Sequence, residues 1–313
     1  VPSRALAKEV TQKIKKLNNK NIRVLSLVGG EEAPNELLTQ HNIWICTTEK
    51  FESILRRKSA SQIVDRVYTI VIDEVHLLAD KDRGALIESL IARIKEQAPY
   101  PRIIGLSATL ENDEEFAGWF NARLLKSKWK PSILNKEILA YKADTREKDF
   151  IKDERRSKLL MNKLIDIKDN PRLNGATLIF CRSKAKCLRH AVELLRKLKG
   201  EEELLQGINT KQEPSNEAKL LLQSSGIGIH YSGYKESHEF LDKFNDKKIE
   251  FLFSTTGLAQ GVNTSAKTVI ISETTIAKDT PLSLNTVNQM LGRAGRKPGE
   301  EGFGIIICPE YEL

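Results

Sequence analysis

The strongest constraint on the fold is the alternation of short apolar runs with amphipathic helical segments. Runs rich in β-branched residues occur at 22–28, 43–46, 68–72 and 103–106, and each is followed by a polar turn and a helical pattern. Uninterrupted apolar strands are typical of parallel sheets buried on both faces, and repeated βα units produce such sheets. In the helical segment 85–94 the apolar side chains share one face, as in a helix packed on a sheet. The sequence therefore predicts an α/β fold.

A second βα series follows a stretch of mixed, charged sequence that contains Pro131. Strands are predicted at residues 176–181, 227–231, 251–254, 268–271 and 303–307, with helices at 184–199 and 235–244. We expect two α/β domains, residues 1–133 and 154–313, joined by a linker over 134–153. The polar segment 200–225 is expected to be an inserted loop with a partial helix.

The composition limits which classes of protein this chain can belong to. Hydrophobic residues form 40% of the 313 residues and charged residues 29%, as in a globular protein, and no apolar run approaches the ~18 residues of a spanning helix. No signal peptide precedes the first strand, so an intracellular location, cytoplasmic or nuclear, without a membrane partner is expected. The net charge of +8 permits attraction to phosphate backbones, although many basic proteins bind no nucleic acid. The four cysteines lack paired C-x-x-C spacing, which indicates reduced, buried thiols.

The residues Asp73-Glu74-Val75-His76 directly follow a predicted buried strand. Acidic side chains at the carboxyl end of a parallel strand lie where α/β proteins bind ligands. One carboxylate there can hold Mg²⁺ while its neighbour orients or deprotonates a water molecule. Taken alone, the tetrapeptide could equally be a helix cap after a strand.

Two further segments carry side chains suited to the same chemistry. Ser107-Ala108-Thr109 also ends a predicted strand, and its hydroxyls can hydrogen-bond a neighbouring acidic loop, although this tripeptide is common in turns. The string from Gln289 to Arg296 places Arg293 and Arg296 on a glycine-containing turn. Both guanidinium groups could point toward one anion such as a transferring phosphoryl group. An exposed basic loop is the alternative.

Together these segments resemble the motifs of superfamily-2 DExH helicases of the Ski-like group. Eight such motifs occur in the order typical of the family, and a chance match of this kind is excluded. The resemblance covers residues 2–7 (motif Ia), 46–50, 73–76 (motif II), 107–109 (motif III), 178–182 (motif IV), 230–233, 254–263 (motif V) and 289–296 (motif VI). It implies two tandem RecA-like domains with parallel sheets, the first of them incomplete, and an ATP-dependent helicase that uses ATP and Mg²⁺.

The resemblance also implies roles for individual residues. Asp73 would hold Mg²⁺, Glu74 would activate water, and His76 would couple the nucleotide site to Ser107 and Thr109. Gln289 would position water, and Arg293 and Arg296 would act as arginine fingers. Gly261 and Asn263 would contact the nucleotide. The strand of nucleic acid would be bound, largely without sequence preference, by Pro2, Arg4, Thr47, Glu49, Thr255 and Thr256.

Finer features are most like archaeal fork-repair DNA helicases and the polymerase-theta helicase domain. They are Asp82-Arg83-Gly84, residues 116–123 and Trp129-Lys130-Pro131. This likeness favours single-stranded or tailed duplex DNA over RNA, 3′ to 5′ movement, and a role in DNA repair or replication-fork processing. An RNA helicase of the same group remains the alternative.

The chain departs from the family in one major respect. It contains no G-x-x-x-x-G-K-[ST] phosphate loop, and no Lys-Ser/Thr follows Gly29-Gly30 at the required spacing. The family also has winged-helix and ratchet domains that do not follow Leu313. We therefore expect a chain truncated at both ends, whose 313 residues alone hydrolyse ATP negligibly. Two other hypotheses are a non-catalytic, nucleic-acid-binding helicase relic and a different superfamily-2 motor, such as a nuclease or remodeller.

Overall fold

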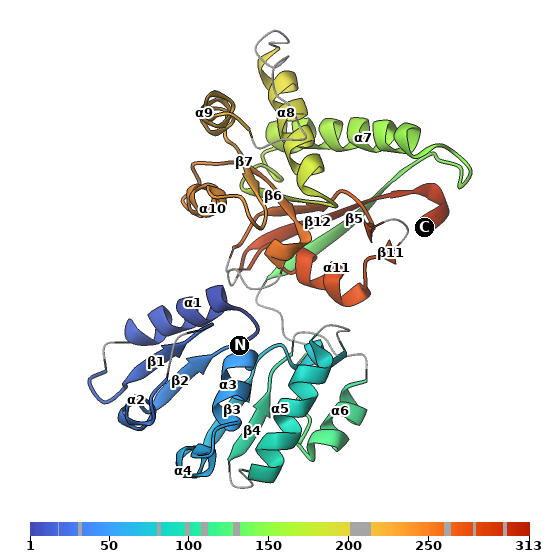
Figure 1. Cartoon of the computed structure of the whole chain (residues 1–313). Coiled ribbons are helices and arrows are strands. Elements are labelled where there is room, and N and C mark those ends of the chain that lie inside the picture. Colours follow the sequence, from blue (N-terminus) through green and yellow to red (C-terminus); the bar gives the residue numbers. More distant parts are fainter. Residues whose placement is uncertain are drawn as a thin grey trace. The chain divides into compact units, whose positions relative to one another are not determined.

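The computed structural model describes the chain as two compact units, Val1–Lys126 and Ser127–Leu313 (Figure 1). We call them unit 1 and unit 2. The structure describes residues 1–17, 19–30, 33–79, 83–97, 101–107, 112–127, 132–200, 214–259, 264–277, 280–296 and 299–313. Within these ranges no helix has both the length and the apolar composition required to cross a membrane.

Unit 1 repeats strands and helices in the order that the sequence predicts. Its elements are α1 (Arg4–Lys15), β1 (Val24–Leu27), α2 (Asn35–Gln40), β2 (Ile43–Cys46), α3 (Thr48–Leu55), α4 (Ala60–Val64), β3 (Thr69–Ile72), η1 (Val75–Ala79), α5 (Gly84–Gln97), β4 (Arg102–Gly105) and α6 (Asp113–Phe120). β1 pairs in parallel with β2, and β3 pairs in parallel with β4.

The two strand pairs of unit 1 differ in how their faces are covered. Helix α1 packs on one face of β1 and β2, where Ala7 contacts Val24 and Ile45. A second cluster of apolar side chains, which includes Leu38 of α2, covers the opposite face. One face of β3 and β4 packs against α5, but the other face exposes Val71 and Ile104, which are register partners. This apolar face is therefore open to solvent, which is unusual for a parallel sheet.

Unit 2 is built around one six-stranded sheet in the order β5-β12-β9-β6-β8-β7, and every hydrogen-bonded pair in it is parallel. The strands are β5 (Ile133–Tyr141), β6 (Thr177–Cys181), β7 (Ile227–His230), β8 (Phe251–Thr255), β9 (Thr268–Ile271) and β12 (Glu301–Pro309). A small antiparallel pair, β10 (Thr275–Ala277) and β11 (Thr280–Pro281), lies outside the sheet. The predicted parallel α/β fold is confirmed.

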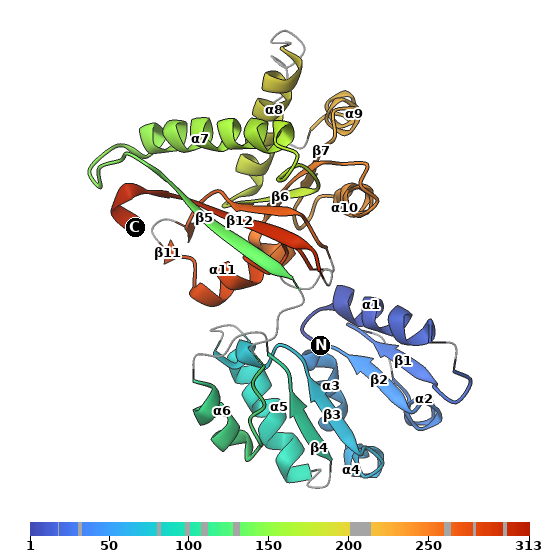
Figure 2. The same cartoon turned by 180° about the vertical axis from the view of Figure 1, so that it is seen from behind.

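Helices of unit 2 lie on both faces of this sheet, with α7 and α11 on opposite sides (Figure 2). They are α7 (Asp149–Asp169), α8 (Lys184–Lys199), α9 (Asn216–Ser224), α10 (Ser237–Asn245) and α11 (Leu284–Leu291), with shorter turns η3 (Thr256–Ala259) and η4 (Glu310–Glu312). The core between the layers is apolar and includes Phe180, Phe240, Phe251 and Phe253, each at most 1% exposed. Burial of this kind is the main stabilising contribution to such a domain.

The division between the units lies earlier than the sequence suggests. Residues 134–153, which we expected to form a linker, contain most of β5 and the start of α7. Strand β5 pairs with β12 along its whole length and belongs to the sheet of unit 2. Its edge position explains the difference, because an edge strand can carry charged residues such as Lys136 and Glu137 that read as a loop.

Candidate functional site

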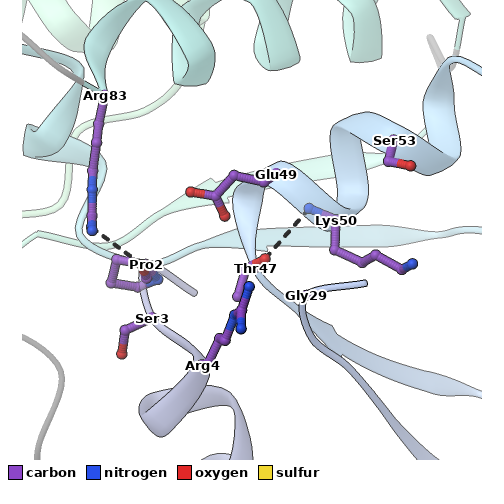
Figure 3. Close-up of a pocket in the computed structure, with 9 residues that line it drawn as sticks. All are labelled: Pro2, Ser3, Arg4, Gly29, Thr47, Glu49, Lys50, Ser53 and Arg83. Atoms are coloured by element: carbon purple, nitrogen blue, oxygen red, sulfur yellow. Dashed lines mark hydrogen bonds between the residues drawn. The ribbon is translucent and has the colours of Figure 1, made fainter. Parts of the chain in front are cut away.

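A cavity of about 490 Å³ lies in unit 1 at the carboxyl ends of β1 and β2 (Figure 3). We call it the unit 1 cavity; its lining residues are Pro2, Ser3, Arg4, Gly29, Thr47, Glu49, Lys50, Ser53 and Arg83. The residues that the first and second motifs assign to strand binding, Pro2, Arg4, Thr47 and Glu49, therefore lie together although two segments of the sequence supply them. The carboxyl ends of parallel strands are the usual place for ligands in such folds.

Two helices begin at this cavity. The hydroxyl of Ser3 accepts a hydrogen bond from the Leu6 amide and caps α1. The hydroxyl of Thr47 accepts from the Lys50 amide at 3.4 Å and caps α3. Helix N-termini carry partial positive charge and unpaired amides, so they favour anions such as phosphate.

The charged side chains around the cavity are mainly cations. Arg4, Lys50 and Arg83 line it together with one carboxylate, that of Glu49. Behind them, burial raises the pKa of the Cys46 thiol to about 11, so this thiol remains neutral at physiological pH. The local charge of the cavity is therefore positive and suits a polyanion.

Gly29 gives Arg4 its position. The backbone of Gly29 has φ +65°, and a Cβ atom added there would lie 2.9 Å from the guanidinium carbon of Arg4. Glycine is the residue that adopts positive φ at little cost. A side chain at this position would displace the Arg4 guanidinium from the cavity wall.

The motif II residues form a tight turn at the carboxyl end of β3. The Glu74 amide donates to Oδ1 of Asp73 at 3.0 Å. Nδ1 of His76, which is 6% exposed, lies 3.2 Å from Oε2 of Glu74 and 3.1 Å from Oγ of Ser107. The structure thus brings Glu74, His76 and Ser107 together, as the sequence predicts, whereas Thr109 lies outside the described residues.

Glu74 has an uncommon backbone conformation. Its φ of +54° lies in the left-handed region, which costs a residue with a Cβ about 1–2 kcal/mol. Such strain persists only where surrounding contacts fix it, and it is frequent at functional sites. The Val75 amide, which donates to the Leu106 carbonyl at 2.9 Å, supplies one of these contacts.

Asp73 is the one predicted metal ligand, and its surroundings fit a single carboxylate ligand for Mg²⁺. One of its oxygens accepts the Glu74 amide, and within the described residues no group of three acidic, His or Cys side chains could enclose a metal ion. Mg²⁺ commonly binds through one or two carboxylates, with water and substrate phosphates completing the shell. A single carboxylate at this position fits a Mg²⁺ ion whose other ligands would be water and substrate phosphates.

In unit 2 the two motif VI arginines have different environments. Arg293 is 6% exposed, and its Nη2 donates to the carbonyl of Ala259 at the end of η3. Arg296 is exposed, and its Nε donates to the Gly292 carbonyl at 3.1 Å. Gln289 lies half-buried on α11 of the same segment.

Close packing of two glycines holds the motif VI loop against β12. A Cβ atom added to Gly302 would lie 2.7 Å from the carbonyl carbon of Ala294 and from the Gly295 nitrogen. The Gly295 amide also donates to the Ala266 carbonyl, and the Ala266 amide donates to the Arg293 carbonyl. The loop that carries both arginines is therefore fixed from two sides.

The motif V threonines lie at the carboxyl end of β8, where Thr255 ends the strand and Thr256 begins η3. Both are half-buried. The adjacent strand β7 ends at His230, whose Nδ1 lies 3.3 Å from the Ser254 hydroxyl. Gly261 and Asn263, which the resemblance assigns to nucleotide contact, lie outside the described residues.

Two groups were not assigned from the sequence. The first comprises Ser3, Gly29, Lys50, Ser53 and Arg83 of the unit 1 cavity. The second is a charge cluster at the carboxyl ends of β6 and β9, where Glu273 forms ion pairs with Lys186 at 3.0 Å, Arg156 at 3.1 Å and Arg182 at 3.3 Å. Burial acts to raise the pKa of the nearby Asp153, but Lys186 and the arginines outweigh it and the pKa is lowered. The family resemblance covers Lys50, Arg83 and Arg182 of these groups, but it assigned none of them a role.

Comparison with known proteins matches each unit to a helicase domain. Residues 1–116 match the DEAD/DEAH box helicase family, and residues 158–298 match the helicase conserved C-terminal domain. The chain is 34% identical over 328 residues to an ATP-dependent DNA helicase Hel308 of Pyrococcus abyssi and 31% identical over 325 residues to that of Pyrococcus horikoshii. Each alignment covers 100% of this chain and 44% of the relative.

A relative from fission yeast extends the comparison beyond the Hel308 proteins. The pre-mRNA-splicing factor brr2 of Schizosaccharomyces pombe is 32% identical over 337 residues, which cover 100% of this chain and 15% of that protein. The chain thus spans less than half the length of these relatives. Because the two family matches follow one another in the order of the two units and the relatives match the chain from end to end, the chain belongs to the superfamily-2 helicases, in the group of Hel308 and brr2, and consists of tandem RecA-like domains.

Proposed function

We propose that this chain is the motor core of an ATP-dependent DNA helicase or translocase that moves 3′ to 5′ along one strand. The observation that carries the proposal is the unit 1 cavity, which joins Pro2, Arg4, Thr47 and Glu49 at the N-termini of α1 and α3. The motif II turn with Glu74 and His76 belongs to the same unit. Strand binding and hydrolysis would therefore share one rigid α/β scaffold.

The cavity would bind the phosphate backbone of the strand. Amides at the starts of α1 and α3 and the Arg4 guanidinium are donors suited to phosphate oxygens. Hydroxyls such as that of Thr47 add neutral donors. Because all of these groups recognise phosphate and not base edges, binding would be largely independent of sequence and would weaken as salt rises. Thr255 and Thr256 would contribute hydroxyl contacts of the same kind from unit 2.

Glu74 would act as the base that orients and deprotonates the attacking water. Its carboxylate Oε2 lies 3.2 Å from Nδ1 of His76, and the Ser107 hydroxyl lies 3.1 Å from the same nitrogen. The contact between His76 and Ser107 would couple changes at this carboxylate to the motif III segment. Asp73 would hold Mg²⁺, which neutralises charge on the nucleotide phosphates.

The phosphate loop itself would come from a part of the protein outside this sequence. The relatives are more than twice as long as the chain, and the open apolar face of β3 and β4 requires a covering layer. We place the helix that follows the phosphate loop against this face, where Val71 is 52%, Ile104 37% and Leu106 48% exposed, with the strand of the loop extending the same sheet. Such a position would bring the loop next to Asp73 and Glu74, which follow β3.

Unit 2 would supply the residues that respond to the nucleotide. Gln289 would orient the attacking water, and Arg293 and Arg296 would stabilise charge on the transferring phosphoryl group. In the structure Arg293 contacts Ala259, so its finger role requires a change of partner. Arg296 is exposed and already accessible to an anion.

The finer sequence likeness to fork-repair DNA helicases favours DNA over RNA, and relatives named as DNA helicases match the chain from end to end, as does the pre-mRNA-splicing factor. A role in DNA repair or replication-fork processing, with single-stranded or tailed duplex DNA as the partner, follows from the same likeness. The alternative is an RNA helicase, which the similarity to a pre-mRNA-splicing factor favours. A non-catalytic strand-binding protein is a second alternative.

Substitutions in the full-length protein test the enzymatic part. Glu74→Gln removes the base but keeps size and hydrogen bonding, so ATP turnover should be abolished while ATP binding is largely retained. Asp73→Asn should also weaken Mg²⁺-dependent ATP binding. Turnover is measured at saturating DNA, and binding with a fluorescent ATP analogue. Wild-type turnover in both variants would show that this turn is not the catalytic centre.

A further inference from the structure

Arg83 lines the unit 1 cavity but belongs to none of the segments assigned to strand binding. It lies just before α5, and its Nη1 donates to the Pro2 carbonyl at 3.2 Å across 81 residues of sequence. Figure 3 shows its side chain extending to Pro2 on the side of the cavity opposite Lys50. The Arg83 side chain is exposed, so its guanidinium is accessible to a ligand in the cavity.

The backbone next to Arg83 is packed against the turn that follows motif II. A Cβ atom added to Gly84 would lie 2.2 Å from the Leu78 carbonyl oxygen and 3.1 Å from its carbon. Only glycine permits this approach. Arg83 is also fixed to α5, because its carbonyl accepts the Ile87 amide at 3.1 Å. Movement of Arg83 would therefore displace η1, because Gly84 packs directly against the Leu78 carbonyl.

The turn η1 connects this contact to Glu74. It begins at Val75, and the Leu77 amide donates to the Glu74 carbonyl at 2.9 Å. A narrow void of about 10 Å³ is lined by Leu77 of η1 together with Pro2, Glu49 and Arg83. The turn η1 thus begins directly after Glu74 and carries His76, and its Leu77 lines a void that shares Pro2, Glu49 and Arg83 with the unit 1 cavity.

We propose that Arg83 binds a backbone phosphate of the strand and transmits occupancy of the unit 1 cavity to Glu74 through Gly84 and η1. A guanidinium presents five donors in a planar fork that matches phosphate oxygens. Phosphate bound at Arg83 would alter its contact with the Pro2 carbonyl, and the tight Gly84–Leu78 packing would carry the change into η1. Arg83 is thus a strand-binding residue that also positions Glu74. The inference rests on the proposed function.

The test uses the full-length protein with Arg83→Ala, Arg83→Lys and a control, Arg66→Ala. Arg66 is an exposed arginine of the same unit that does not line the cavity. Affinity for fluorescein-labelled oligothymidylate is measured by anisotropy at several salt concentrations without nucleotide. ATP turnover is measured at saturating oligothymidylate. Thermal unfolding of each variant checks that it folds.

Arg83→Ala should reduce the slope of log affinity against log salt by about 0.7, the value for one lost phosphate contact to a single strand. Turnover at saturating strand should also fall, on the order of tenfold, as expected for loss of coupling between two sites. Arg83→Lys keeps the charge but not the fork, so it should restore the salt slope and not the turnover. Arg66→Ala should match the wild type in both measurements.

An unchanged salt slope in Arg83→Ala would overturn the phosphate contact, and turnover fully restored at saturating strand would overturn the coupling. If Arg83→Ala does not fold, full turnover in Arg83→Lys would still refute the coupling. Failure of the wild-type protein to bind oligothymidylate or to hydrolyse ATP would instead reject the proposed function, and the inference with it.

Discussion

His230 makes the stability of unit 2 sensitive to pH in a way that can be calculated. The residue ends β7, and its Nδ1 lies 3.3 Å from the Ser254 hydroxyl. Burial, with a smaller contribution from the charge of His238, lowers its pKa from 6.5 to about 4. The imidazole is therefore neutral in the folded protein at pH 7.

The sign of the effect follows from the depressed pKa. Above pH 6.5 neither the folded nor the unfolded state binds the proton, so His230 costs nothing. As pH falls from 6.5 toward 4, only the unfolded state takes up the proton and stability is lost. The gap between the two pKa values corresponds to a maximum of about 3 kcal/mol, of which about 2 kcal/mol is lost at pH 5.

Comparison of the wild type with His230→Asn isolates this contribution, since asparagine is polar but does not titrate. Urea unfolding followed by circular dichroism at pH 7.5 and pH 5 should show the wild type losing about 2 kcal/mol more than the variant. Carboxylates that titrate in both proteins cancel in the difference. NMR titration of the histidine rings should place the His230 pKa near 4. Equal losses in the two proteins, or a His230 pKa near 6.5, would refute the reasoning.

Three further substitutions test local packing by urea unfolding. Gly302→Ala should lower the free energy of unfolding by about 1–3 kcal/mol, because the added Cβ would lie 2.7 Å from the Ala294 backbone. Gly257→Ala is the matched control, because a Cβ added there would have no atom within 4 Å. Equal effects of the two substitutions would contradict the close approach at Gly302. Glu273→Gln should lower the free energy of unfolding by about 3 kcal/mol, because three cations lose their buried counter-charge. Unchanged stability would show that these ion pairs contribute little. Ser107→Ala should cost about 1 kcal/mol through loss of the His76 contact, and unchanged stability would indicate that this bond is not formed in solution.

The strands and helices of the core could be predicted because local signals agree there with burial. Strand β2 and helix α8 have the predicted bounds. The hydroxyl of Ser183 caps the start of α8, and Gly200 in the left-handed conformation ends it, both of which are visible in the sequence. Strand β5 could not be predicted, because its structure depends on pairing with β12 and not on its own apolar pattern.

The candidate site likewise contains residues that could be predicted from the sequence and residues that could not. The family resemblance assigned Pro2, Arg4, Thr47 and Glu49 to strand binding, and the structure places them around one cavity. The position of Arg83 could not be derived, because it depends on the approach of Gly84 to Leu78 and on a bond to Pro2 across most of the unit. The separate environments of Arg293 and Arg296 likewise depend on packing of their loop against Gly302.

ATP-dependent strand displacement by the full-length protein tests the proposed motor function most directly. The substrates are DNA duplexes with a 3′ or a 5′ single-stranded tail and the matching RNA duplexes, each incubated with ATP and Mg²⁺ and with Glu74→Gln as the inactive control. We expect displacement of the 3′-tailed DNA duplex by the wild type, little displacement of the 5′-tailed or RNA duplexes, and none by Glu74→Gln. Displacement that persists in Glu74→Gln, or that occurs only on RNA, would contradict an ATP-driven 3′ to 5′ DNA motor.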